Sequence, residues 1–265
     1  MMRKVIDHLW IWGHEAGSHN SAYGLKGLSR MTPAEGAFYL GVPNLLMVRY
    51  GGRPAPPFDQ YALALSPLRR VVWSIVGAGG RTEAQELEMV LALAGRFPNI
   101  SGVIMDDFFK ERPDDEGRIA VHTVEELEAI RKRLFVDGRR LDLWVTLYTH
   151  NLNLPGLKEY LDRCDVITYW TWHASDLSRL EENFERLEDL TPFSRKALGC
   201  YMWDYGDGRP MPVAFMRHQC QLGLRWLRED RIEAMIFLAS CICDLGIEAV
   251  EWTRRWIQKV GEEEV

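Results

Sequence analysis

The sequence predicts a single (β/α)8 barrel spanning residues 1–265, and three observations lead to this fold class. Short apolar runs rich in Val, Ile, Trp and Tyr alternate with longer segments of helical period, as in repeated βα units. Eight runs of each kind can be counted along the chain. Dividing 265 residues by eight gives about 33 per unit, the size of a βα unit, and the total is close to the roughly 250 residues of such barrels.

The expected strands are the runs in which β-branched and aromatic residues concentrate. In chain order they are Val5–Trp12, Leu45–Tyr50, Val71–Val76, Gly102–Asp106, Leu141–Tyr148, Val166–Trp172, Ala197–Trp203 and Ala234–Cys241. A doubly wound open sheet also fits alternating elements, but it usually has fewer strands, and no GxGxxG motif follows the first run.

Several of the intervening helices begin with recognisable signals. These are Thr32 before Pro33, Thr82 before Glu83, Thr123 with Glu126 as a capping box, and Ser175 before Asp176. The glycine-dense segment 77–80 precedes one of these helices. We interpret it as a strand-to-helix turn rather than as a cradle for phosphate.

Composition and charge exclude several classes of protein. With 47% hydrophobic residues, the chain can bury a substantial core without disulfides, and its five cysteines form no CxxC pair. We expect reduced thiols, with Cys241 and Cys243 on one face of the last strand. The net charge of −6 and the absence of a basic stripe argue against nucleic acid as a partner. The apolar runs are too short for a membrane span.

The first four residues, MMRK, resemble the n-region of a secretory leader, but the segment that follows does not. Asp7 and His8 interrupt the first apolar run, and no small-residue cleavage site follows it. We therefore expect a cytoplasmic protein, while a leader removed before position 1 would leave no trace in this sequence.

Aromatic residues concentrate in the expected strands rather than in the helices. Seven of the ten tryptophans lie there, namely Trp10, Trp12, Trp73, Trp144, Trp170, Trp172 and Trp203. Barrel active sites form at the carboxyl ends of the strands, so several of these rings should line an open mouth. Rings with polar atoms suit a ligand with apolar faces and polar edges, such as a sugar.

Acidic residues close several of the same strands. Asp106 and Asp107 end the fourth strand, Asp204 ends the seventh, and Asp244 follows the eighth. Adjacent carboxylates repel, so one should stay protonated near neutral pH while the other remains ionised. Glycoside hydrolysis requires one carboxylic acid and one carboxylate. In the structural alternative, Asp107 caps a loop and Asp106 pairs with an arginine such as Arg49.

The segment SGVIMDDFF, residues 101–109, resembles the strand-four signature of barrel glycoside hydrolases. The nearest resemblance is to tandem-Asp hexosaminidases of the O-GlcNAcase type, and a more distant one is to chitinase-like barrels. The resemblance implies that Asp106 orients and polarises the substrate's 2-acetamido group and that Asp107 is general acid and base. The chain also resembles barrels that place the acid on strand four and the nucleophile on strand seven. That resemblance implies that Asp107 is the acid and Asp204 the nucleophile. The chain has no room for the accessory domains of many such enzymes.

Two further classes of protein remain open. His8, His14, His19, His150 and His173 could join Asp106 around a divalent metal in an isomerase-like or hydrolytic barrel, but HxH and HExxH motifs are absent. A barrel that binds carbohydrate without cleaving it would keep the aromatic cleft. Serine or cysteine nucleophiles are disfavoured, because the chain has no GxSxG motif.

The sequence therefore predicts a glycosidase with Asp106 and Asp107 as catalytic residues and Asp204 as the next candidate. Carbohydrate is the expected partner, with no cofactor and no metal, and the sugar, its linkage and the oligomeric state are left open. The expected substrate-binding residues are Arg49, Tyr148, Trp170, Trp172, Trp203, Tyr205 and Asp244.

Overall fold

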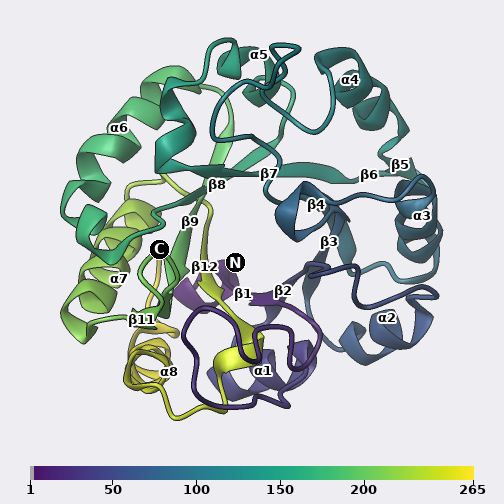
Figure 1. Ribbon diagram of the computed structural model, residues 1–265. Coiled ribbons are helices and arrows are strands. Elements are labelled where there is room, and N and C mark those ends of the chain that lie inside the picture. The colour runs from purple at the N-terminus through teal and green to yellow at the C-terminus, as the bar shows by residue number, and fades with distance from the viewer. Residues whose placement is uncertain (1–2) are drawn as a thin grey trace.

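Eight parallel strands close into a barrel in the computed structural model, which describes residues 3–265 (Figure 1). The barrel strands are β1 (Leu9–Gly13), β2 (Asn44–Met47), β3 (Arg70–Val76), β4 (Ile100–Met105), β7 (Asp142–Tyr148), β8 (Val166–Trp170), β9 (Arg195–Tyr201) and β12 (Ala234–Leu238). β1 pairs with both β2 and β12, so the sheet has no free edge. The predicted fold class and all eight predicted strands are thereby confirmed.

Eight helices form an outer ring around the strands (Figure 1). They are α1 (Pro33–Leu40), α2 (Asp59–Leu65), α3 (Glu86–Arg96), α4 (Val124–Arg133), α5 (Leu157–Leu161), α6 (Leu180–Leu190), α7 (Val213–Arg228) and α8 (Glu248–Val260). Two short hairpins lie outside the barrel, β5 (Phe135–Val136) with β6 (Arg139–Arg140), and β10 (Trp203–Asp204) with β11 (Arg209–Pro210). No helix among residues 3–265 is long and apolar enough to cross a bilayer.

The ends of five predicted strands need correction, and two of them simply stop early, β2 at Met47 rather than Tyr50 and β8 at Trp170 rather than Trp172. Residues 5–8 form a 3-10 helix, and the first strand begins only at Leu9. Trp203 belongs to the β10 hairpin rather than to a barrel strand. Cys241 lies in a 3-10 turn after β12, so it shares no strand face with Cys243, although both thiols are buried and free. Apolar composition alone does not mark these ends, because buried turns beside the barrel are as apolar as the strands.

Two of the four predicted helix starts are confirmed. The hydroxyls of Thr32 and Thr123 accept hydrogen bonds from the amides three residues later, and both starts are capping boxes. The Thr82 start is wrong, because its hydroxyl donates instead to the Ile75 carbonyl at 2.8 Å and α3 begins at Glu86. The Ser175 start is also wrong, because Ser175 lies within a 3-10 turn that precedes α6.

Tryptophans fill much of the barrel interior, where branched aliphatic residues are usual. The ring centroids of Trp10 and Trp144 lie 5.2 Å apart, and those of Trp12 and Trp170 are also 5.2 Å apart. Gly199 on β9 leaves space for one of these rings, since a Cβ atom there would lie 2.0 Å from Cδ2 of Trp170. The upper layer of this core forms the floor of the site described next.

Candidate active site

A narrow cavity, here called the deep hollow, opens at the carboxyl ends of the barrel strands. Its volume is about 50 Å³. It is lined by Trp12, His14, His19, Tyr23, Tyr50, Ala78, Asp106, Asp107, Thr146, Tyr148, Trp170, Trp172, Tyr201, Tyr205 and Leu238.

A wider cavity of about 830 Å³, here called the outer groove, adjoins the deep hollow. Asp107, Tyr148 and Trp172 line both cavities and so mark their boundary. The outer groove is also lined by Gly79, Phe109, Glu111, Thr149, His150, His173 and Asp176.

Asp106 and Asp107 both line the deep hollow, although they are consecutive residues. Side chains that follow one another along a strand point to opposite faces of the sheet. Here β4 ends at Met105, and Asp107 has a φ of +44°, in the left-handed region that Asp adopts more readily than most residues. The backbone therefore turns immediately after the strand, and this turn brings the second carboxyl to the same cavity as the first.

Asp106 is buried, and its pKa is raised well above the usual range of an aspartic acid. Burial is the largest cause, and the negative charge of Asp107 adds to it. Hydrogen bonds from the Asp107 amide, at 2.9 Å, and from Thr146 act in the opposite direction but do not outweigh burial. Asp106 is thus the member of the pair whose pKa is raised, chiefly by burial and only secondly by the crowding that the sequence suggested.

The carboxylate of Asp107 is held by two donors. The Tyr148 hydroxyl donates to Oδ1 at 2.6 Å, and the Gly79 amide donates to Oδ2 at 2.7 Å. Burial and the neighbouring Tyr201, Asp107 and Asp106 raise the pKa of Tyr148 well above 10, so its hydroxyl keeps the proton that it donates. The glycine-dense turn at 77–80 therefore has a second role, because it fixes one oxygen of this carboxylate.

Aromatic rings form the walls around the carboxyl pair. Tyr148 stacks on His150 with ring centroids 5.2 Å apart and planes 9° apart. Trp172 meets Tyr148 edge to face at 5.9 Å and Tyr201 at 5.8 Å. The Tyr205 ring lies 5.2 Å from that of Tyr201 and 6.2 Å from that of Trp172. Such walls present both flat apolar faces and hydroxyl groups, the combination that a sugar ring requires.

The two histidines of the deep hollow are neutral. Burial lowers the pKa of His14 to about 4 and that of His19 to about 2. His14 donates through Nδ1 to the Val48 carbonyl at 2.8 Å and accepts through Nε2 from Trp12 at 3.1 Å. Both ring nitrogens of His14 are thus occupied, which leaves no lone pair for a metal.

Among the residues that the structure describes, no set of histidines and carboxylates with ligand-like spacing includes Asp106, although His14 and His19 line the same hollow. His8 lies at the opposite end of the barrel, where its Nδ1 donates to the Glu233 carbonyl at 2.7 Å. Within residues 3–265, one set with ligand-like spacing is His173, Asp204 and Asp207, whose ligand atoms lie within 4.8 Å of one another. Arg209 pairs with both of these carboxylates, at 3.1 and 2.6 Å, so an internal ion-pair network already occupies the set.

Of the ten predicted site residues, the structure brings six together around the deep hollow: Asp106, Asp107, Tyr148, Trp170, Trp172 and Tyr205. The other four line neither cavity. Trp203 turns away, and its indole Nε1 donates to the Tyr23 carbonyl at 2.8 Å. Asp204 is fully buried and anchors the β10–β11 hairpin through Arg209.

Arg49 and Asp244 also lie outside the deep hollow and the outer groove. The Arg49 guanidinium is buried and pairs with Glu86 and Glu83, each at 2.8 Å. The pairing of Arg49 with Asp106, which the sequence left as an alternative, is therefore wrong. Asp244 is exposed and accepts from the Arg30 amide at 2.9 Å.

Several lining residues were not among the predicted ligands. Tyr50, Tyr201 and Trp12 lie at or near strand ends, so their positions and aromatic character gave a usable signal. His19 and Tyr23 come from the irregular segment between β1 and α1, where no periodicity indicates which side chains turn inward. Their inclusion depends on the tertiary path of that loop.

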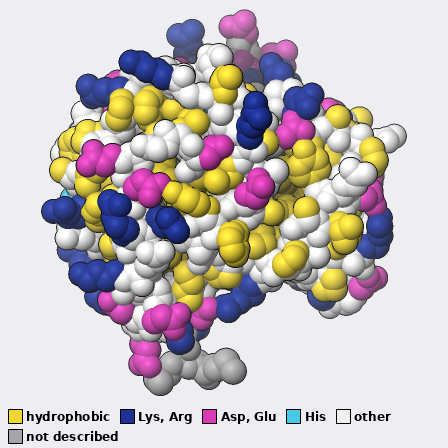
Figure 2. Space-filling view, turned by 90° about the horizontal axis from the view of Figure 1, so that it is seen from below, with side chains coloured by type: hydrophobic (Ala, Val, Ile, Leu, Met, Phe, Trp, Pro, Cys, Tyr) yellow, Lys and Arg dark blue, Asp and Glu magenta, His cyan; other side chains and the backbone are white. Residues whose placement is uncertain are grey.

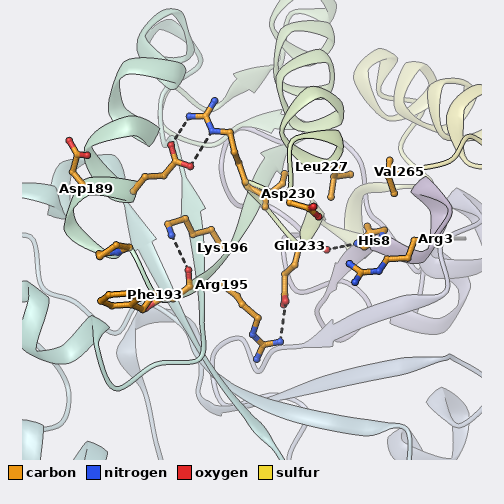
Figure 3. A pocket seen from close by; sticks show the side chains of 15 residues that line it. Arg3, His8, Asp189, Phe193, Arg195, Lys196, Leu227, Asp230, Glu233 and Val265 are labelled. Carbon is orange, nitrogen blue, oxygen red and sulfur yellow. Dashed lines mark hydrogen bonds and ion pairs between the residues drawn. The ribbon is translucent and has the colours of Figure 1, made fainter.

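A separate cavity of about 730 Å³ opens at the amino-terminal ends of β9 and β12 (Figure 3). Two ion pairs lie among its lining residues, Arg195 with Glu233 at 3.0 Å and Arg231 with Glu188 at 2.6 Å. Lys196 donates to two backbone carbonyls there, at 2.7 and 2.9 Å. This end of a barrel ordinarily serves stability rather than catalysis, and the internal pairing agrees with that role.

Comparison with solved structures shows the fold alone. A putative α-L-fucosidase from Bacteroides thetaiotaomicron matches with a TM-score of 0.61 and 11% identity, covering 99% of this chain and 97% of the other. A family GH18 chitinase from Cycas revoluta, solved with allosamidin, matches with a TM-score of 0.56 and 13% identity, covering 94% and 99%. The tryptophan synthase A-subunit from Pyrococcus furiosus matches with a TM-score of 0.50 and 12% identity, covering 98% and 99%.

No family model and no curated protein matches the chain. The structural neighbours include a synthase as well as glycoside hydrolases, so the shared barrel does not by itself select a reaction. The chain has a TIM-barrel fold of the kind found in glycoside hydrolases.

Proposed function

We propose that this protein is a glycosidase whose sugar substrate binds in the outer groove and is cleaved by Asp106 and Asp107. The observation that carries this proposal is the pair itself, a neutral buried carboxylic acid beside a carboxylate whose two oxygens are fixed by donors. Together they hold the one proton and the one negative charge that glycoside hydrolysis requires.

The sizes of the two cavities support a substrate with a small substituent beside the scissile bond. At about 50 Å³ the deep hollow is smaller than a pyranose ring, whereas the outer groove, at about 830 Å³, has room for one. We place a 2-acetamido group in the deep hollow, which Asp106 and Thr146 line. We therefore infer a 2-acetamido sugar as the substrate, with its ring against Trp172 and Tyr148.

The reaction then proceeds by substrate assistance. The acetamido carbonyl oxygen attacks the anomeric carbon as the bond to the leaving oxygen breaks, and Asp107 gives the leaving oxygen its proton. Water subsequently attacks the same carbon, the bond between that carbon and the acetamido oxygen breaks, which restores the acetamido group, and the water passes a proton back to Asp107. An amide N–H donated to Asp106 favours the ionised form of Asp106, which then polarises the acetamido group, while Asp107 lines the outer groove and faces the leaving oxygen.

The test is a panel of chromogenic glycosides that includes 2-acetamido-2-deoxy sugars. We expect turnover of a 2-acetamido substrate, and Asp107→Asn should lower kcat by about 10²- to 10⁴-fold while retaining binding, as for loss of a general acid. Asp115→Asn, which changes an exposed aspartate outside both cavities, is the matched control and should behave as wild type.

Other outcomes of the same panel would contradict the proposal. Saturable binding of sugars without any product would indicate a carbohydrate-binding barrel without catalysis. Loss of turnover with a chelator and recovery with a divalent ion would indicate metal-dependent chemistry. Unchanged turnover in Asp107→Asn would remove that residue from the mechanism.

A further inference from the structure

A groove between α7 and α8 on the outside of the barrel combines an aromatic floor with a cationic rim. Its volume is about 540 Å³. Trp252 and Trp256, one turn apart on α8, form the floor together with Leu224 and Val260. The two indole planes are 17° apart, with centroids separated by 6.4 Å. Both rings are partly exposed, so the groove presents a nearly flat apolar surface.

The rim of this groove carries positive charge. Arg217, Arg255 and Lys259 are exposed, and none of them pairs with a carboxylate within residues 3–265. Arg228 is the exception, because it pairs with Glu263 at 2.5 Å. Lys and Arg side chains gather at the left of Figure 2, on the side where α8 lies in Figure 1. An unneutralised cationic rim is notable in a chain whose net charge is −6.

We propose that the groove between α7 and α8 is a second binding site, which takes an acidic sugar chain. Its three unpaired cations are complementary to carboxylate or sulfate groups. Its two nearly parallel indoles are complementary to the flat C–H faces of successive sugar rings. A sugar acid offers both features on one unit, whereas an acidic peptide would satisfy the cations without needing the flat floor.

The identification of the ligand as a sugar rests on the proposed function, while its acidic character rests on the charge of the groove. The site lies on the outer helices and shares no residue with the deep hollow or the outer groove. Its role is therefore to hold a chain on the enzyme rather than to take part in bond cleavage.

The experiment measures binding of hexagalacturonate by calorimetry at low and at moderate salt, with maltohexaose as the neutral probe of equal length. We expect hexagalacturonate to bind more tightly than maltohexaose and to weaken as salt rises. Trp252→Ala and the double variant Arg255→Glu/Lys259→Glu should each weaken binding roughly tenfold or more. Lys132→Glu on α4 removes an exposed lysine elsewhere on the barrel and should leave binding unchanged.

Three outcomes would overturn the inference: equal binding of the neutral and acidic hexamers, no binding of either, or tighter binding of a hexaglutamate peptide than of hexagalacturonate. Thermal unfolding of each variant shows whether it is folded. The two groove variants change different positions of α8, so if one of them misfolds the other still tests the site. Binding is measured on Asp107→Asn as well. Groove binding that persists in a protein without glycoside turnover separates failure of the proposed function from failure of this site.

Discussion

The contact between Gly199 and Trp170 gives a sharp test of how the site is built. A Cβ atom at position 199 would lie 2.0 Å from Cδ2 and 2.2 Å from Cε3 of the Trp170 ring, far inside any allowed separation. The ring cannot simply withdraw. It is 1% exposed, it packs against Trp12 at 5.2 Å and Tyr201 at 4.9 Å, and its Nε1 donates to the Thr168 hydroxyl at 2.9 Å.

Gly199→Ala should therefore be strongly destabilising. Overpacking of a core usually costs about 1–3 kcal/mol, and a ring held on three sides places this substitution at the upper end, at about 3 kcal/mol. For a chain of this size each kcal/mol lowers Tm by about 2–4 °C, so we expect a fall of about 6–12 °C. Because Trp170 lines the deep hollow, any ring displacement should also weaken ligand binding there.

Thermal unfolding followed by circular dichroism measures the effect, with Gly95→Ala in α3 as the matched control. A Cβ atom at Gly95 would meet its nearest neighbour, Asp137 Oδ2, at an ordinary 3.4 Å. Replacing a helical glycine there should be neutral or stabilising by up to about 1 kcal/mol. A Gly199→Ala protein with the Tm of the wild type would show that the ring does not cover position 199, and the described floor of the deep hollow would be wrong.

Three further predictions concern the carboxyl pair and one helix start. Tyr148→Phe removes the hydroxyl that donates to Asp107 at 2.6 Å, and a hydrogen bond to a charged group contributes about 1.5–3 kcal/mol, so kcat/KM should fall about 10- to 100-fold and Tm should fall as well. Unaltered turnover would exclude that role. The unfolding free energy of Asp106→Asn, taken relative to that of the wild type, should be higher at pH 8 than at pH 4.5. The raised pKa of the Asp106 carboxyl makes the wild type lose unfolding free energy as the pH rises from the pKa of this group in the unfolded chain towards its pKa in the folded protein, and the variant lacks this group. Urea unfolding at both pH values measures this, and an equal difference at the two would contradict the raised pKa. Thr32→Ala should lower the unfolding free energy by about 1 kcal/mol through loss of the α1 cap, whereas Thr32→Ser should retain most of it.

The sequence was sufficient for the architecture because the signals involved are local. Alternating apolar runs and helical segments required only periodicity, and the number of units followed from chain length. The capping boxes at Thr32 and Thr123 depend on residues three positions apart, and both were found. Thr82 also precedes an acidic residue at an expected helix start, but its hydroxyl donates to the Ile75 carbonyl on β3. A pattern of residues within one turn does not indicate a partner on the preceding strand.

The site was only partly predictable because its residues meet through the tertiary fold. Strand-end positions correctly indicated Tyr148, Trp170 and Trp172 as lining residues. The same rule indicated Asp204, which the β10–β11 hairpin turns away and pairs with Arg209. Arg49 is an expected substrate-binding residue and the alternative partner of Asp106, whereas its buried partner is Glu86, on a helix that begins 37 residues later in the chain.

The tandem aspartates show most clearly why a motif needs backbone geometry before it implies chemistry. In a regular strand their carboxyls would face opposite sides, one towards the barrel and one towards the helices. The left-handed φ of Asp107 directs both to one cavity, and the amide of that residue donates to the carboxyl of its neighbour. Asn tolerates this conformation nearly as well as Asp, whereas Ala does not. Asp107→Asn therefore removes the carboxyl while keeping the turn, and loss of turnover in Asp107→Ala alone would not distinguish missing chemistry from a displaced Asp106.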